Sequence, residues 1–339
     1  MPEASKRIVI CADGTWNDPE DAYPTNVLRF ARAIRPEDAN GVQQVVFYDW
    51  GVGSYYGEIA GGVSGLGIMK NIQDCYRFVV QNYDPGDQIF LFGYSRGAYT
   101  VRALAGMLNN CGILTRPNAG LIPEAFDFYK KRSAKPGSAA AAAWRQARAV
   151  EPGRGIVHFI GVWDTVGALG IPTRVLAFVD ERDLFFDTEI GSNVRVARHA
   201  VSIDEQRADF EPTLWGPKEA VDIRQVWFAG VHGDVGGGTR PKGGRSLSEI
   251  PLAWMAREAA AAGLALEPHL HGSVAGLHTA DAHTSYKRFW KMLGSKVRQI
   301  PADGIVHRSV RDRFEALDYR PAPLTSWLSA NGGWGTVES

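Results

Sequence analysis

The fold is decided by the stretch Gln88-Ile89-Phe90-Leu91-Phe92-Gly93-Tyr94-Ser95-Arg96-Gly97. Its first five residues form an apolar run typical of a buried strand, and residues 98–109 have the amphipathic pattern of a helix. The five residues between them match G-x-S-x-G, the nucleophile elbow, in which a sharp strand-to-helix turn exposes the serine hydroxyl. Gly93 and Gly97 must be small because a side chain at either position would collide with the turn. We therefore expect an α/β fold with Ser95 as a nucleophile; a Gly-Ser turn that only caps a helix is the alternative.

Strand and helix patterns alternate on both sides of this stretch. Apolar runs predict further strands, and apolar residues at helical spacing predict the helices between them. The expected strands cover residues 8–11, 44–48, 156–163 and 226–230. The expected helices cover residues 26–34, 68–83, 138–149 and 247–262. This order predicts a mostly parallel sheet with helices on both faces, and we expect an α/β-hydrolase with helical insertions that form a cap.

The length of 339 residues is compatible with one or two domains, and the continuous alternation favours a single α/β-hydrolase domain over residues 7–335. The pattern loosens at about 112–150 and 168–222, which we expect to be helical insertions. Beyond Gly263 the sequence becomes rich in loops, so residues 264–339 are predicted to form a loop-rich C-terminal extension.

Composition and charge argue against several classes of protein. The chain has 37 basic and 37 acidic residues, so its formal charge of zero offers no general field for a phosphate backbone, and we expect no nucleic-acid partner. Cys11, Cys75 and Cys111 have the spacing of neither a zinc site nor a disulfide framework, and we expect no metal and no cofactor. No apolar run approaches the roughly 20 residues of a transmembrane helix or forms a signal peptide. These features predict a soluble, cytoplasmic protein.

A serine nucleophile needs a base to take its proton and a carboxylate to orient that base. In α/β-hydrolases the chain order is serine, acid, histidine, with acid and histidine at the ends of later strands. Asp164 follows the strand expected at 156–163, and His232 follows the strand expected at 226–230. We therefore expect Ser95, Asp164 and His232 to form a catalytic triad.

Other residues compete for two of these roles. His199 and His307 are the rivals of His232, and Asp204 and Asp234 are the rivals of Asp164. Asp234 stands only two residues beyond His232, where a local loop hydrogen bond is the simpler interpretation.

The developing oxyanion needs two backbone N–H donors, of which one normally comes from the residue after the nucleophile, here Arg96. The second is expected from the loop after the first strand, at Gly14 or Thr15. A tight turn in which Asp13 makes a local side-chain bond is the alternative for that loop. Aromatic residues beside these positions are expected to contact substrate: Trp16, Tyr94 and Trp163.

Five pieces of the chain together resemble one family. They are residues 12–17, 51–53, 93–98, 161–167 and 230–237. In order and spacing they resemble the bacterial α/β-hydrolase domain of type VI secretion phospholipase effectors of the first lipase class, over roughly residues 7–262. The segments 305–310 and 319–321 look like the end of that family's pattern. The resemblance implies that Ser95, Asp164 and His232 carry hydrolysis of lipid esters.

Two departures limit what the resemblance implies. Gly233 stands where serine is common in the family, and the effectors carry a long further C-terminal region for membrane docking, whereas this chain stops soon after the hydrolase pattern. A stand-alone esterase is therefore as plausible as a toxin.

The leading interpretation is a serine hydrolase that cleaves carboxylic esters through an acyl-enzyme. Its expected substrate is a small-molecule or lipid ester, and transient contact with a lipid surface is compatible with it. The alternative is a non-catalytic binding or regulatory module on the same fold. A nucleotide-binding enzyme has weak support, because neither Gly65-Leu66-Gly67 nor Gly236-Gly237-Gly238 completes a phosphate-binding pattern after a strand.

Overall fold

A parallel β-sheet forms the centre of the computed structural model, which describes residues 6–14, 20, 22–51, 65–131, 135–166, 189–285 and 294–338. Its strands follow the order β2-β1-β3-β4-β5-β6-β7-β8, and every neighbouring pair in that order is parallel. The strands are β1 (Lys6–Ala12), β2 (Gln43–Asp49), β3 (Gln88–Tyr94), β4 (Val157–Trp163), β5 (Val194–Ser202), β6 (Asp222–Phe228), β7 (Ile305–His307) and β8 (Val337–Glu338).

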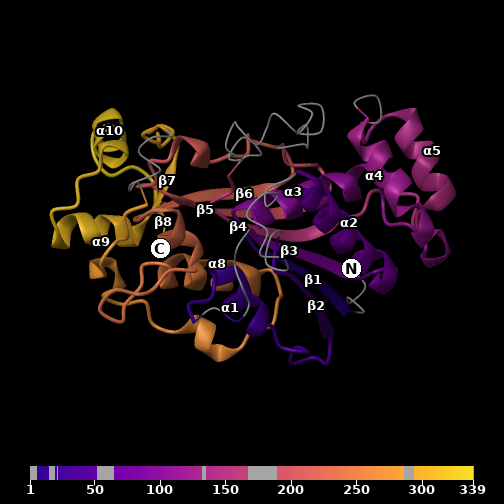
Figure 1. Ribbon diagram of the computed structural model, residues 1–339, viewed down its shortest axis with the longest axis horizontal. Helices are drawn as coiled ribbons and strands as arrows, with labels where there is room; N and C mark the ends of the chain where they lie inside the picture. Colours follow the sequence, from indigo (N-terminus) through magenta and orange to yellow (C-terminus); the bar gives the residue numbers. More distant parts are fainter. Residues whose placement is uncertain are drawn as a thin grey trace.

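Helices cover both faces of this sheet. Figure 1 shows α2 and α3 on one side of it and α1 and α8 on the other. The α-helices of the described residues are α1 (Asn26–Arg32), α2 (Gly65–Asn82), α3 (Arg96–Cys111), α4 (Ile122–Lys130), α5 (Ala139–Arg148), α7 (His232–Gly236), α8 (Glu249–Ala261), α9 (Arg308–Ala316) and α10 (Ala322–Ala330). The expected class, an α/β protein with a mostly parallel sheet and helices on both faces, is confirmed.

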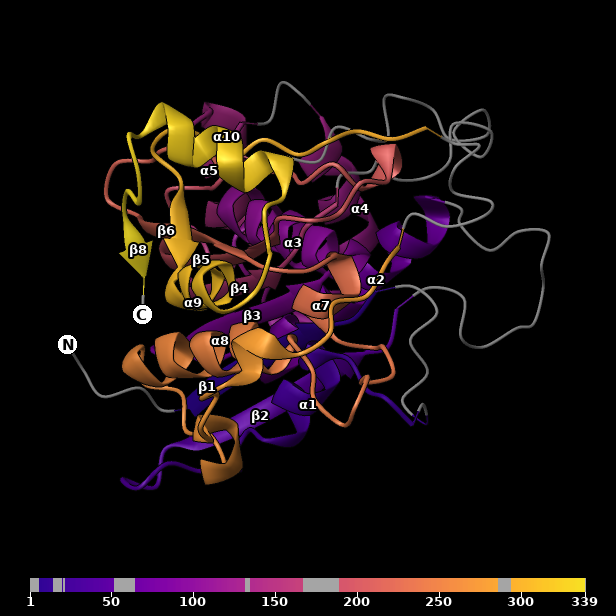
Figure 2. The same cartoon turned by 90° about the vertical axis from the view of Figure 1, so that its left-hand side faces the viewer.

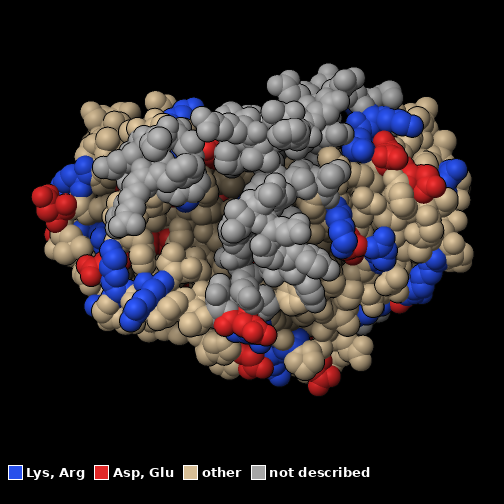
Figure 3. Space-filling view, in the orientation of Figure 1, with Lys and Arg blue, Asp and Glu red and all other residues tan. Residues whose placement is uncertain are grey.

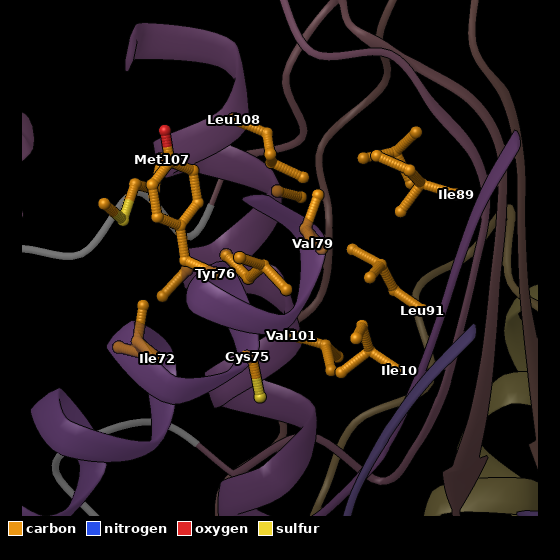
Figure 4. Close-up of a cluster of buried hydrophobic side chains, with 14 of the residues drawn as sticks. Ile10, Ile72, Cys75, Tyr76, Val79, Ile89, Leu91, Val101, Met107 and Leu108 are labelled. Atoms are coloured by element: carbon orange, nitrogen blue, oxygen red, sulfur yellow. The ribbon is translucent and has the colours of Figure 1, made fainter. Parts of the chain in front are cut away.

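The apolar runs of the strands follow from burial on both faces. Successive side chains of a strand point to opposite faces, so both sets must be apolar when both faces are covered. In β1 and β3, Ile10, Ile89 and Leu91 join the core under α2 and α3, as Figure 4 shows. Phe90 and Phe92 alternate with them and join the second core, under α1 and α8.

A third core lies on the side of the sheet that ends in β7 and β8. Val201 and Trp227 of the sheet pack there with Val306, Leu324 and Trp327. Figure 2 shows α9 and α10 on the side of the sheet where β8, the outermost strand, pairs with β7. The region beyond residue 264 therefore completes the sheet. The prediction of a loop-rich extension was wrong for residues 305–316, 322–330 and 337–338, which form β7, α9, α10 and β8. The two strands are too short to give a sequence pattern.

One further expectation needs correction. Residues 112–150, the first expected insertion, carry α4 and α5, whereas the second expected insertion, 168–222, contains the central strand β5. Arg198 lies in the middle of this strand, and its charge hides the apolar pattern. The charge is accommodated because Arg198 pairs with Asp222 and Glu258. Residues 167–188 lie outside the described part of the chain.

Charges are mixed on the face seen in Figure 3, where basic and acidic side chains alternate over the described residues. None of the helices in the described part of the chain combines the length and the apolar character needed to cross a bilayer.

Candidate active site

Ser95 occupies the sharp turn between β3 and α3. Its backbone has φ 56° and ψ −121°, a conformation that residues other than glycine rarely adopt. The Ser95 N–H donates to the carbonyl oxygen of Trp163 at 3.1 Å, which ties the turn to the end of β4. Such local strain persists only where the surrounding structure enforces it, and it is concentrated at functional sites.

The glycines on either side of Ser95 are required by close backbone packing. A Cβ atom at Gly93 would overlap the backbone of Gly97 and Ala98 across the turn. A Cβ atom at Gly97 would overlap the carbonyl groups of Ala12 and Asp13 at the end of β1. The collision predicted from the sequence is therefore present at both positions.

Asp164 lies next to Ser95 at the same edge of the sheet, because Tyr94 pairs with Trp163 in the parallel register and each is followed by one of these two residues. Asp164 also has a positive φ, 42°, and it is completely buried. Its Oδ2 atom is 2.6 Å from Nδ1 of His232, and its Oδ1 atom accepts the N–H of Ser202 at 2.9 Å. The carboxylate is thus held by the ends of two strands.

His232 is the first residue of α7, and aromatic rings fix its orientation. Its ring stacks on Tyr94 with a centroid separation of 4.6 Å, and Phe210 meets it edge-on at 5.0 Å. Because Nδ1 donates to the Asp164 carboxylate, the neutral ring carries its lone pair on Nε2. Burial lowers the pKa of His232, and Asp164 opposes that shift only in part. Burial therefore favours the neutral ring, and its orientation is fixed by Asp164 and the two aromatic rings.

Two buried ion pairs flank this histidine. Arg298 donates to both carboxylate oxygens of Asp164, at 2.7 and 3.0 Å. Burial alone would raise the pKa of Asp164, but Arg298 and His232 outweigh it and hold that pKa far below its usual range. Glu205 accepts the N–H of His232 at 3.3 Å and pairs with Arg207 through both oxygens at 2.9 Å. Burial opposes the shift, yet the pKa of Glu205 falls to about 2 through Arg207.

Sequence reasoning missed these flanking groups. Glu205 and Arg207 stand just after the unexpected strand β5, so identifying that strand would have placed them at the carboxyl edge of the sheet. Arg298 is 134 residues from Asp164 in the chain, and no motif surrounds it.

The rival aspartates are engaged elsewhere. Asp204 accepts the N–H of Gly230 at 2.7 Å and the hydroxyl of Tyr319 at 2.8 Å. Asp234 lies 2.5 Å from Nδ1 of His283, and it also accepts backbone N–H groups, including that of Val231 in its own turn. Of the three candidates, the structure therefore places Asp164 against His232.

The rival histidines also have other partners. His199 is completely buried in β5, where its Nε2 accepts the N–H of Thr165 at 3.1 Å, and burial lowers its pKa to about 3. His307 caps α9 by accepting the N–H of Ser309 at 3.2 Å. Neither ring is bonded to Asp164 among the described residues.

The first loop departs from the predicted oxyanion hole. The N–H of Gly14 donates to Oδ1 of Asp13 at 2.7 Å, so the local bond considered as the alternative is present and Gly14 is not a free donor. Asp13 also accepts the hydroxyls of Thr25 and Tyr48, and burial raises its pKa to about 6. The remaining donor candidate of this loop, Thr15, lies outside the described residues.

The residues expected to contact substrate lie in different environments. Trp163 was predicted to contact substrate, but it is completely buried in the core beside Phe30 and Phe92, because its position in β4 points into the covered face of the sheet. Tyr94 is buried too, and its ring supports His232. Trp16 lies outside the described residues. Arg96 begins α3 directly after Ser95, the place expected of an oxyanion donor.

The described residues contain no group of three or more metal-binding side chains.

Residues 6–258 match the family described as "T6SS, Phospholipase effector Tle1-like, catalytic domain". The chain belongs to this family. The Tle1-like match includes all the segments that carry Ser95, Asp164 and His232, and it ends before Arg298.

Relatives of this Tle1-like domain are longer proteins. The uncharacterized protein YEL023C of Saccharomyces cerevisiae is 27% identical over 240 residues, which cover 63% of this chain and 33% of the yeast protein. An uncharacterized protein from Pseudomonas aeruginosa of known crystal structure shares the fold, with a TM-score of 0.52, 18% identity and coverage of 95% of this chain and 52% of that one.

A Tle1 effector solved in complex with the VgrG spike of the type 6 secretion system aligns with a TM-score of 0.39 and 18% identity, over 71% of this chain and 52% of the effector. The chain thus spans about a third of the yeast relative and about half of each solved protein.

Proposed function

We propose that this Tle1-like domain is a serine hydrolase of the α/β-hydrolase fold that cleaves carboxylic esters of lipids through an acyl-enzyme. One observation carries the proposal: the Asp164–His232 hydrogen bond of 2.6 Å lies at the same sheet edge as a serine in a strained strand-to-helix turn. Family membership supports a phospholipase-like substrate.

Each of the three residues has a defined part in the proposed reaction. Nε2 of His232 takes the proton of the Ser95 hydroxyl as Oγ attacks the carbonyl carbon of the ester. Asp164 stabilises the imidazolium that forms and keeps Nδ1 as the protonated nitrogen. When the tetrahedral intermediate collapses, the carbon–oxygen bond to the alcohol breaks and the imidazolium gives its proton to the leaving alkoxide.

Water completes the cycle by the same proton path. His232 takes a proton from water, the hydroxide attacks the acyl carbon, and the bond to Oγ of Ser95 breaks as the serine regains its proton. The negative oxygen of each intermediate needs preorganised N–H donors. The N–H of Arg96 is the proposed first donor, and that of Thr15 is the proposed second donor.

The test compares the wild-type protein with Ser95→Ala on nitrophenyl esters of increasing acyl length and on phosphatidylcholine vesicles. We expect Ser95→Ala to lose at least about a thousandfold in turnover while keeping its melting temperature, since a disabled triad retains only binding and oxyanion stabilisation. Ser329→Ala, which changes an exposed serine in α10, is the matched control and should behave as wild type. Absence of any hydrolysis by the wild-type protein would favour a non-catalytic binding module instead.

A further inference from the structure

Arg298 comes from a segment outside the family match, and its role rests on the proposed function of Ser95, Asp164 and His232. The segment 294–298 runs antiparallel to residues 206–208 beyond the end of β5. The N–H of Lys296 donates to the carbonyl oxygen of Gln206 at 2.9 Å, and Arg207 pairs with Ser295 in an antiparallel bridge. This pairing places the residues that follow, including Arg298, at the carboxyl edge of the sheet.

Acceptors surround the two terminal nitrogens of the Arg298 guanidinium, whereas its buried Nε has no hydrogen-bond partner among the described residues. Its side chain is 3% exposed, and its two terminal nitrogens donate to both oxygens of Asp164. Nη1 also lies 2.8 Å from both the carbonyl and the hydroxyl oxygen of Ser202, so its two hydrogens are shared among three acceptors. Nη2 also donates to the carbonyl of Phe210. A planar guanidinium matches two carboxylate oxygens at once, which a lysine ammonium cannot do.

Phe210 and Ser202 connect this clamp to the rest of the site. Phe210 meets the ring of His232 edge-on, and Ser202 donates its N–H to Asp164. Movement of the guanidinium would therefore shift both the Asp164 carboxylate and the Phe210 ring that packs against His232.

The charges around His232 balance. The groups that face it from neighbouring elements are Asp164 after β4, Glu205 and Arg207 after β5 and the uncharged rings of Tyr94 and Phe210. Arg298 adds its charge from the far side of Asp164, with which it is paired. On its own helix, Asp234 is bonded to His283. Two carboxylates and two guanidiniums leave the immediate surroundings neutral, so loss of one guanidinium would favour a positive ring.

We propose that Arg298 is a positioning residue that holds Asp164 in place for His232. By balancing the negative charge of Asp164, it also keeps the imidazole of His232 neutral and able to act as a base in mildly acidic solution. The fork of Arg298 leaves one lone pair of Oδ2 for Nδ1 of His232. The clamp thereby sets both the direction of the hydrogen bond and the protonation state of the base.

The two parts of this role separate in two variants. Arg298→Gln removes the positive charge, so the apparent pKa of the Asp164–His232 pair should rise. The pH below which kcat/KM falls should therefore increase by about one unit. Arg298→Lys keeps the charge but loses the fork, so kcat should fall about tenfold or more while the acid limb stays within a few tenths of a unit of wild type.

The matched control is Arg145→Gln. Arg145 is a buried arginine of α5 that donates to the carbonyl oxygens of Asn110 and Pro136, away from the site. It should lose stability without any movement of the pH profile. An Arg298→Gln profile that superimposes on wild type after scaling, or an Arg298→Lys variant with wild-type kcat, would overturn the proposal. If Arg298→Gln does not fold, the kcat of Arg298→Lys alone tests the proposed role of Arg298.

The NMR titration of the histidine rings separates this inference from the proposed function. We expect the signal that disappears in His232→Gln to titrate at higher pH in Arg298→Gln than in wild type. That shift in a protein without esterase activity would refute the hydrolase proposal and leave the role of Arg298 standing. An unchanged titration would contradict the role of Arg298, whether or not esters are hydrolysed.

Discussion

Asp164 is the residue on which the site converges. It is hydrogen-bonded to the His232 ring, to the Arg298 guanidinium and to the backbone N–H of Ser202. Its own backbone has a positive φ, which aspartate tolerates better than most residues. Its carboxylate is ionised because Arg298 and the hydrogen bonds it accepts outweigh the cost of burial. The same carboxylate thus serves the stability of the fold and the orientation of the His232 ring.

We expect Asp164→Asn to lower turnover by up to about ten-thousandfold, because an amide favours the wrong tautomer of His232. The variant also leaves Arg298 buried without its countercharge, which should reduce the free energy of unfolding by about 3–5 kcal/mol. Ester hydrolysis and denaturant unfolding measure the two effects.

Asp204→Asn and Asp234→Asn are the controls for that substitution. Their carboxylates bond Gly230 and Tyr319 in one case and His283 in the other, so turnover should fall much less. A larger loss of turnover in either control than in Asp164→Asn would contradict the assignment of the acid.

The sequence predicts part of the site at this scale. Ser95, Asp164 and His232 each follow an apolar run, so their placement at one sheet edge follows from parallel strands. Arg298 could not be predicted, since its contact depends on a distant irregular segment. Trp163 was misjudged because a residue at a strand end can face the covered side of the sheet.

At the scale of elements, the elbow depends on how closely α3 approaches β1. Gly97 lies against the carbonyl groups that end β1, and Gly93 lies against the first turn of α3. This contact is between backbones, so a side chain cannot rotate away to relieve a clash.

We therefore expect Gly97→Ala to reduce the free energy of unfolding by about 2–3 kcal/mol, the cost of overpacking a rigid contact. Gly120→Ala is the control, because a Cβ atom there meets no atom within 4 Å. Chemical denaturation measures both. Equal stability of the two variants would show that α3 can move away from β1 at little cost.

Strands β1, β2, β3, β4 and β6 could be predicted because their apolar runs follow from coverage of both sheet faces. Strand β5 could not, since Arg198 and His199 interrupt its pattern and are accommodated only by tertiary partners. Those partners are Glu258 and Asp222 for the arginine, and Gln225 and the N–H of Thr165 for the histidine.

At the scale of the whole molecule, the C-terminal region completes both the sheet and the site. Strand β7 covers the edge of β6, and Val306, Leu324 and Trp327 close the third core over Trp227. The same region supplies Arg298. The family match ends at residue 258, so the matched part alone lacks this cover.

A chain that ends at Ala262 should therefore fail to unfold cooperatively, because it exposes the edge of β6 and one face of Trp227 to water. Circular dichroism during thermal unfolding measures this, with the full chain as control. A truncated chain that melts as sharply and as high as the full chain would contradict the contribution of the C-terminal region.

The central claim is that His232 activates the Ser95 hydroxyl, and covalent labelling with a fluorophosphonate tests it most directly. Oγ of Ser95 attacks phosphorus, fluoride leaves and His232 takes the hydroxyl proton, so the adduct forms only when the base and the nucleophile work together. Mass spectrometry of the peptide that contains Ser95 should show the phosphonyl adduct in the wild-type protein and none in His232→Ala. Equal labelling of both proteins, or an adduct on another residue, would contradict the account.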